Sequence, residues 1–207
     1  MKWEGFEALG QYAGQRKREF KLITEERKTQ LSRLAKAISR DLDLECSADL
    51  IFICTHNSRR SHMGHIWAQV AAYTYGIMGI RGFSGGTEDS AFNPRAVKAL
   101  RMAGLEIEAL DEGANPRYLV RFPGAEDGVR IFSKHFEDPP NPTKDFIAVM
   151  SCSDADEACP VVTGASSRHS ITYEDPKAYD DGPEQDAMYE ERSQQIAREM
   201  FYLFSLI

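Results

Sequence analysis

The sequence predicts an α/β protein with a doubly wound, mainly parallel sheet flanked by helices, and three observations support this. Residues 50–53 (LIFI) form a short continuous apolar run, which is typical of a strand buried on both faces. A polar loop and a helical pattern over 61–76 come directly after that run. Strand and helix patterns then keep alternating, as they do in sheets that are covered by helices on both sides.

The local pattern assigns the remaining elements in order. Before the first strand, Thr24 is a suitable N-cap for an amphipathic helix, because two glutamates follow it. Asn93 and Pro94 begin a later helix, which ends at Gly104. The other expected elements are a short strand at 80–83, a glycine-rich turn at 85–86, a strand at 146–150 and a long helix from about residue 183.

Two segments stand outside this α/β rhythm. Residues 1–48 are predicted to be a helical N-terminal extension, and residues 49–207 the main domain. The apolar stripe of the extension, from Leu31 to Leu42, predicts burial on the protein's own core, with a partner or dimer surface as the alternative. Residues 115–145 are rich in proline around an expected strand at 129–132, so we interpret them as an insertion in the main domain.

The composition is that of an ordinary globular protein and excludes several classes. The 207 residues, 42% of them hydrophobic, are enough for one compact domain with extensions. No apolar run approaches the roughly 20 residues that span a bilayer, and the amino end lacks the apolar core of a secretion signal. We therefore expect a cytoplasmic protein without a membrane partner. The net charge of −7 argues against a nucleic-acid partner.

The four cysteines are Cys46, Cys54, Cys152 and Cys159. In a reducing compartment they are not expected to form structural disulfides, which leaves metal binding, catalysis or plain burial. Composition alone does not distinguish these roles, so the spacing of the cysteines and their neighbouring residues has to be considered. Cys46 has no partner in the sequence pattern and is expected to be inert.

The segment after the first strand has the composition of an oxyanion-binding loop. Between a strand end and a helix start, successive backbone N–H groups form an anion nest that the helix dipole reinforces. Arg60 supplies the bidentate fork for a phosphate-like group, and the positive field favours the nucleophilic thiolate of Cys54. Ser61 can donate to that thiolate, and Asn57 tolerates a left-handed backbone. The expected oxyanion-binding residues are Thr55, His56, Asn57, Ser58, Arg59, Arg60 and Ser61.

Cys152 and Cys159 are seven positions apart on a polar segment that suits a loop or short helix able to rearrange. Zinc prefers a closer cysteine pair with two further ligands, which the spacing does not offer. The alternative is two unconnected thiols. His62 and His65 are three apart on a helix without a third ligand in the pattern, so we expect surface or hydrogen-bonded histidines and no metal or organic cofactor.

The pattern Cys-x5-Arg-Ser at 54–61 resembles the active-site loop of the low-molecular-weight protein tyrosine phosphatase family. Within that family, CTHNS at 54–58, SGGTE at 84–88 and NPRAV at 93–97 are similar to the thioredoxin-coupled arsenate reductases. The resemblance covers about residues 49–112 and 145–207, and it implies the family's four-stranded sheet. It leaves out the N-terminal extension and the insertion.

The resemblance also implies a mechanism. Cys54 attacks arsenate, Cys152 and Cys159 form the disulfide relay, and thioredoxin is the reductant. A carboxylic acid protonates the departing oxygen. Its expected place is after the second cysteine cluster and before the last helix, which selects Asp175 of Asp-Pro over Asp138, an identical dipeptide in the insertion.

Two departures from the family keep alternatives open. Arg59 stands where many relatives have a second cysteine or a small residue, and Lys177 and Ala178 follow Asp-Pro where phosphatases usually have an aromatic. Phe92 remains a candidate wall of a pocket. The first alternative is a tyrosine phosphatase that acts through a phosphocysteine, and the second is a non-catalytic module that binds an oxyanion or a phosphoprotein.

Overall fold

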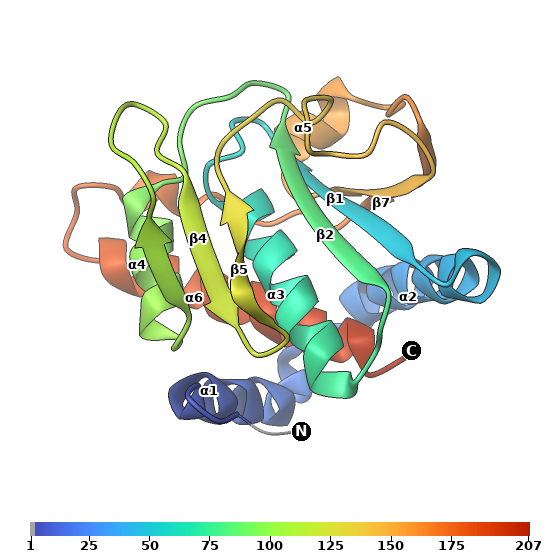
Figure 1. Cartoon of the computed structure of the whole chain (residues 1–207), viewed down its shortest axis with the longest axis horizontal. Coiled ribbons are helices and arrows are strands. Elements are labelled where there is room, and N and C mark those ends of the chain that lie inside the picture. Colours follow the sequence, from blue (N-terminus) through green and yellow to red (C-terminus); the bar gives the residue numbers. More distant parts are fainter. Residues whose placement is uncertain (1–2) are drawn as a thin grey trace.

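A four-stranded parallel sheet lies at the centre of the part of the chain that the structure describes (Figure 1). The structure is a computed structural model, and it describes residues 3–207; residues 1 and 2, where the expected extension begins, lie outside the described residues. The strand order is β2-β1-β6-β7, and every pairing is parallel. The strands are β1 (Ala48–Cys54), β2 (Ile80–Gly86), β6 (Phe146–Met150) and β7 (Ala165–Ser170). The predicted fold class is thereby confirmed.

Both faces of this sheet are covered, which explains why β1 and β6 are buried along their whole length. Leu50 and Phe52 of β1 belong to the large hydrophobic cluster beneath the helices, whereas Ile51 and Ile53 belong to a smaller cluster on the opposite face. The helices are α1 (Glu7–Arg18), α2 (Glu25–Glu45), α3 (Arg60–Tyr75), α4 (Pro94–Met102), α5 (Ser153–Ala158) and α6 (Gln185–Phe204), with 3₁₀ turns at Phe20–Leu22 and Pro176–Tyr179.

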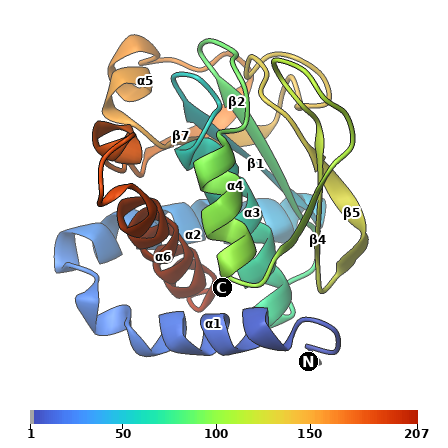
Figure 2. The same cartoon turned by 90° about the vertical axis from the view of Figure 1, so that its left-hand side faces the viewer.

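The N-terminal helices pack on the protein's own core, as the first of the two sequence interpretations predicts. Leu9 of α1 and Leu31 of α2 are fully buried in the large cluster. The ring of Tyr12 stacks on that of Trp67 in α3, with centroids 5.1 Å apart. Thr24 accepts a hydrogen bond from the amide of Arg27, so it caps α2 as expected. Figure 2 shows α1 and α2 lying against α6.

Part of the proline-rich insertion lies in a second sheet that the sequence did not predict. This antiparallel sheet has the order β3-β4-β5, formed by β3 (Glu106–Ala109), β4 (Tyr118–Phe122) and β5 (Ala125–Ile131). The sequence indicated only the end of β5, because the prolines suggested irregular structure. The prolines instead flank the strands, and Pro123 with Gly124 forms the tight turn between β4 and β5, where Gly124 has φ +85.

The predicted turn at Gly85 and Gly86 is wrong, because both glycines belong to β2. They pair with Ile53 and Cys54 of β1. They are needed for close approach rather than for a turn, since a Cβ on Gly85 would lie 2.3 Å from the Cα of Phe136. The edge strand β7 was also missed, because its sequence ASSRHS is mostly polar. Among residues 3–207 no helix has the length and apolarity to cross a membrane.

Candidate active site

The candidate site forms at the carboxyl end of β1. Cys54 is the last residue of β1 and Arg60 is the first residue of α3, so residues 55–59 form the connecting loop. Asn57 has φ +43, which is the left-handed backbone expected for this loop. Ligands of open α/β sheets bind at this end of the strands, close to the positive ends of helix dipoles.

A chain of hydrogen bonds leads from the main chain of Lys134 to the sulfur of Cys54. The Lys134 amide donates to Asn57 Oδ1 at 3.0 Å, and Asn57 Nδ2 donates to Ser61 Oγ at 2.9 Å. Ser61 Oγ lies 3.0 Å from Cys54 Sγ. A backbone amide can only donate, so it fixes which end of the Asn57 amide faces Ser61. Ser61 therefore accepts from Asn57, and its own proton is free to point at the sulfur.

The segment after β5 also holds the outer side of the loop. Ser133 Oγ donates to the carbonyl of His56 at 3.0 Å and accepts from the Ser90 amide at 2.8 Å. Gly86 exchanges two backbone hydrogen bonds with this segment, donating to Lys134 and accepting from Phe136. The sequence did not predict these contacts, because they depend mainly on backbone groups and leave no residue pattern.

Asp175 lies against both arginines of the loop. Arg60 Nη2 donates to Asp175 Oδ2 at 2.8 Å, and Arg60 Nη1 donates to the carbonyl of Tyr173 at 2.8 Å. Arg59 Nη2 lies 3.2 Å from Oδ2, and Arg59 Nε lies 2.8 Å from Oδ1. The other Asp-Pro aspartate, Asp138, accepts from the His135 amide within its own turn. The structure therefore brings Asp175 to the loop.

The charges around Asp175 keep it ionised in this structure. Burial alone raises the pKa of its carboxyl, but Arg60, the amide of Lys177 and Arg59 outweigh burial and hold the pKa below its ordinary value. Burial likewise opposes the charge of Arg59, yet the pKa of Arg59 is raised by its ion pair with Asp175.

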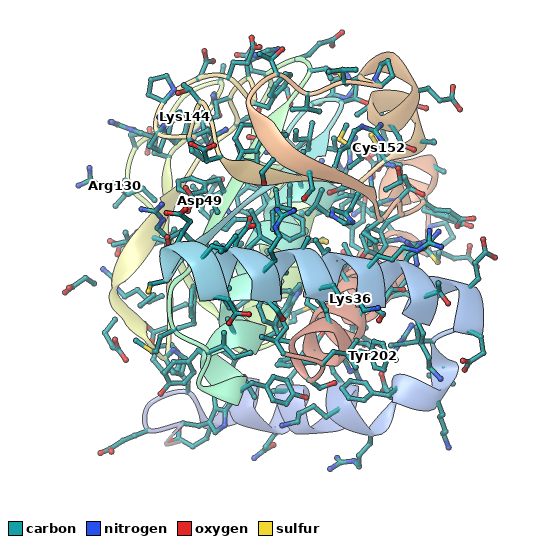
Figure 3. All side chains as sticks on the ribbon, turned by 90° about the vertical axis from the view of Figure 1, so that its right-hand side faces the viewer. Lys36, Asp49, Arg130, Lys144, Cys152 and Tyr202 are labelled. Atoms are coloured by element: carbon teal, nitrogen blue, oxygen red, sulfur yellow. The ribbon has the colours of Figure 1, made fainter. Side chains whose placement is uncertain are left out.

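The three cysteines expected to react meet in one hydrophobic cluster. Cys54 and Cys152 belong to the smaller cluster, and Cys159 packs against it. Cys152 is fully buried, its Sγ lies 3.4 Å from Thr55 Oγ1, and it accepts from the Ala155 amide at 3.4 Å. Figure 3 shows Cys152 beside α5, at the end of the molecule away from α1.

All four cysteines, which lie within the described residues, are free thiols. Cys159 follows the last residue of α5 and is partly exposed, and its carbonyl accepts a hydrogen bond from Arg168. Cys46 is exposed at the C-cap of α2, where it has φ +57. Cys46 is therefore separate from the cluster that contains the other three.

Of the two interpretations of the histidines near the loop, surface or hydrogen-bonded, the structure excludes the surface position for both and gives His62 a hydrogen bond. His62 and His65 are not surface residues but are buried in α3, because this helix lies between the sheet and α6 and is covered on most sides. His62 Nδ1 bonds to Ser84 Oγ at 3.0 Å, whereas among the described residues His65 has only Gln69 as a side-chain partner, and this contact does not outweigh its burial. Burial lowers the pKa of both, that of His65 to about 3. Phe92 is a fully buried core residue whose ring packs on that of His62.

The N-terminal helix α2 holds the segment that carries Asp175. Arg27 Nη2 donates to the carbonyl of Thr172 at 2.6 Å, and its guanidinium lies 5.3 Å from the centroid of the Tyr173 ring. Arg27 also forms an ion pair with the buried Glu199 of α6 at 3.4 Å. The extension thus contributes to the geometry of the site, which its apolar stripe alone did not indicate.

The fold and the site define a class of protein. They describe a parallel α/β protein in which a strand–loop–helix unit places a cysteine, an arginine and a carboxylate where a tetrahedral oxyanion can bind and react. No protein-family model matches the sequence.

The curated relatives that this chain resembles are named arsenate reductases. The chain is 26% identical over 129 residues to arsenate reductase 2 of Staphylococcus epidermidis, an alignment that covers 61% of this chain and 77% of the relative. It is 28% identical over 128 residues to the arsenate reductase of Staphylococcus aureus strain Newman, with the same coverage. The resemblance to arsenate reductases that the sequence motifs indicated is confirmed.

Two solved structures align with about three quarters of this chain at low sequence identity. An arsenate reductase in the phosphate-binding state is 17% identical, covers 76% of this chain and 97% of its own, and gives a TM-score of 0.48. A low-molecular-weight phosphotyrosine phosphatase from Vibrio cholerae is 13% identical, covers 77% and 95%, and gives 0.49.

Proposed function

We propose that this protein reduces arsenate to arsenite with Cys54 as nucleophile and Cys152 and Cys159 as a disulfide relay. The observation that carries the proposal is that all three cysteines contact one hydrophobic cluster beside an oxyanion-type loop. Of these three cysteines, a phosphatase with this loop needs only Cys54. The names of the curated relatives support the same function.

Binding begins with an exchange of partners at Arg60. In the structure Arg60 is paired with Asp175, so the arginine needed by the oxyanion is occupied. Arsenate carries two negative charges near neutral pH and competes for Arg60 through bidentate hydrogen bonds. As Arg60 turns to the oxyanion, Asp175 loses a cation and gains an anionic neighbour. Both changes favour its protonation, which prepares it to act as an acid.

The first chemical step joins Cys54 to arsenic. The Cys54 thiolate attacks arsenic, and one arsenic-bound hydroxyl takes a proton from Asp175 and leaves as water. Ser61 donates to Cys54 Sγ before the attack, which stabilises the thiolate. The arsenic is still As(V) in the resulting thioester-like adduct.

The relay then reduces the arsenic. The Cys152 thiolate attacks Cys54 Sγ, a disulfide forms, and the sulfur–arsenic bond breaks with its electron pair remaining on arsenic. Arsenite, As(III), is released. Cys159 next attacks Cys152 Sγ, which frees Cys54 as a thiolate and leaves a Cys152–Cys159 disulfide. Cys152 and Cys159 lie at the two ends of the six-residue helix α5, so we expect α5 to unwind in this step.

We propose thioredoxin as the reductant, in a cytoplasmic setting that keeps such thiols reduced. To reduce the Cys152–Cys159 disulfide, the dithiol of thioredoxin has to reach one of its two sulfur atoms. Cys159 is partly exposed, and Val161 nearby has 81% of its surface exposed, so this end of the relay is the accessible one. No metal or organic cofactor takes part in the proposed steps.

The test is arsenate-dependent NADPH consumption with thioredoxin and thioredoxin reductase. Cys54→Ser, Cys152→Ser and Cys159→Ser should each abolish turnover, and Cys46→Ser should leave it unchanged. Steady hydrolysis of an aryl phosphate that survives Cys152→Ser, without arsenate turnover, would establish the phosphatase alternative. Binding of arsenate without any turnover would establish the non-catalytic module.

A further inference from the structure

We propose that Arg59 is a positioning residue for Asp175: it holds the carboxylate above the loop while Arg60 turns from that carboxylate to the bound oxyanion. The inference rests on the proposed function, in which Asp175 supplies a proton at this site. It assigns a different role to a loop residue that the sequence analysis placed among the oxyanion-binding residues and marked as a departure from the family.

The two arginines hold Asp175 differently. Arg59 reaches both carboxylate oxygens, with Nε 2.8 Å from Oδ1 and Nη2 3.2 Å from Oδ2. Arg60 hydrogen-bonds Oδ2 through Nη2, and its other terminal nitrogen donates to the carbonyl of Tyr173. Arg59 also has a single hydrogen bond, to Oδ2, but its Nε adds an ion-pair contact with Oδ1 that lacks hydrogen-bond geometry. Arg59 is thus close to both carboxylate oxygens and has no other carboxylate or carbonyl partner among the described residues, so its contact can persist when Arg60 turns away.

Burial ties Arg59 to Asp175. Arg59 is 8% exposed, and within residues 3–207 Asp175 is the carboxylate that pairs with it. A buried guanidinium that lost its partner would carry an uncompensated charge, which is strongly unfavourable. Arg59 is thus expected to stay with Asp175 when Arg60 leaves.

Without Arg59, the exchange at Arg60 would release Asp175. Turning Arg60 breaks its bond to Asp175 and its bond to the carbonyl of Tyr173, two residues earlier. The remaining hold on the carboxylate itself would be the amide of Lys177, which donates to Oδ1 at 3.0 Å. Arg59 supplies the side-chain contact that keeps the carboxyl within reach of the leaving oxygen.

The charged and titratable groups facing Asp175 set the expected direction of the pH effect. They are Arg59 from the loop, Arg60 from α3 and the hydroxyl of Tyr189 from α6, together with the Lys177 amide. Replacing Arg59 with a neutral residue removes a cation and raises the pKa of Asp175. It also leaves Arg60 as the single cation shared by the carboxylate and the oxyanion, so oxyanion affinity falls.

The direct experiment is a carbon-13 NMR titration of the Asp175 carboxyl in the full chain, with inorganic phosphate as the probe. The signal is assigned by its loss in Asp175→Asn. In Arg59→Gln the carboxyl should titrate about one pH unit or more higher than in wild type, the size of effect an adjacent cation has on an aspartate. Phosphate should bind about tenfold more weakly. Arg59→Lys, which keeps the charge, should return the titration of Asp175 most of the way to the wild-type value.

Arg130→Gln is the matched control, because Arg130 is exposed on β5 and points away from the site (Figure 3). An Asp175 titration in Arg59→Gln that matches wild type and Arg130→Gln would overturn the proposal. The proposal would also be overturned if Arg59→Gln weakened phosphate binding by the same factor in the wild-type protein and in the Asp175→Asn variant. Arg59 would then act on the oxyanion directly and not through Asp175. If Arg59→Gln does not fold, Arg59→Met, which also lacks the charge, is titrated in its place, and the same rise in the pKa of Asp175 is expected.

The two proposals fail separately. Absence of arsenate turnover in the wild-type protein removes the proposed function but leaves the Asp175 titration and the phosphate affinity as measured. An unchanged titration with intact arsenate turnover removes only the role of Arg59.

Discussion

At the scale of single residues, a main-chain donor sets the direction of the hydrogen bonds that reach the nucleophile. The Lys134 amide can only donate, so Asn57 presents its Nδ2 to Ser61, and Ser61 presents its proton to Cys54. A hydroxyl that donates stabilises a thiolate, whereas one that accepts does not. The orientation of one amide side chain thereby favours the reactive form of the cysteine.

Ser61→Ala should therefore slow the reaction of Cys54 with iodoacetamide at neutral pH by about fivefold, corresponding to about 1 kcal/mol for one hydrogen bond. The physical reason is the loss of the hydrogen bond from Ser61 to the sulfur. Mass spectrometry of the alkylated peptide measures the rate at this cysteine alone. Alkylation of the exposed Cys46 serves as the internal control and should not change. An unaltered rate at Cys54 would mean that Ser61 does not donate to it.

At the scale of elements, close approach of backbones builds the site. Strand β2 ends in two glycines because other backbone atoms occupy the space of a side chain. A Cβ on Gly86 would lie 2.1 Å from the carbonyl oxygen of Glu88, 2.6 Å from that of Thr55 and 2.7 Å from the amide of Asn57. Two of these three atoms belong to the loop, so the end of β2 supports the loop directly.

Gly86→Ala should lower the free energy of unfolding by about 2 kcal/mol, since added volume must displace backbone atoms. It should also weaken phosphate binding, because the loop moves. Gly14→Ala is the matched control: this glycine is inside α1, a Cβ added to it would lie 3.9 Å from the nearest atom, and the exchange should stabilise the protein by about 1 kcal/mol. Urea unfolding measures both. Equal effects of the two substitutions would contradict this account of Gly86.

At the scale of the whole molecule, the segments outside the family resemblance are part of one structure with the site. The N-terminal helices share the large hydrophobic cluster with α3 and α6. Arg27 of α2 supports the segment before Asp175, and the segment after β5 supports the loop. The resulting enclosure also buries groups that water would otherwise solvate, among them His65 and Lys134.

This burial predicts a loss of stability in acid. The folded pKa of His65 is lowered to about 3, whereas an unfolded histidine titrates at about 6.5. Between these values the unfolded chain binds one more proton than the folded chain, so stability falls as the pH falls through this window, by up to about 1.4 kcal/mol per pH unit. Urea unfolding at several pH values measures the effect.

The comparison is with His65→Leu, which cannot take up the proton in either state. The difference in unfolding free energy between wild type and this variant should shrink or reverse steadily as the pH is lowered from 6 to 4. A difference that stays constant over this range would show that His65 is protonated equally in both states. The variant's own stability at neutral pH does not enter this test, because the test compares only how the difference in unfolding free energy changes with pH.

Much of the fold could be predicted because its signals are local. The apolar run in β1, the cap at Thr24 and the Asn93–Pro94 helix start depend on neighbouring residues. The antiparallel sheet and β7 could not be predicted in the same way. Their strands are short or polar, and long-range pairing stabilises them rather than an apolar pattern.

The sequence by itself determined the parallel α/β sheet, the loop from Cys54 to Ser61 and the candidate identity of each reactive residue, because spacing along one chain segment carries that information. Only the tertiary structure decided how these residues meet. It placed Asp175 between Arg59 and Arg60, gathered three cysteines at one hydrophobic cluster, and aimed Ser61 through an amide from a distant segment. The physical reason is that ion pairs, cluster packing and backbone hydrogen bonds join residues far apart in the chain, and no local pattern records their partners.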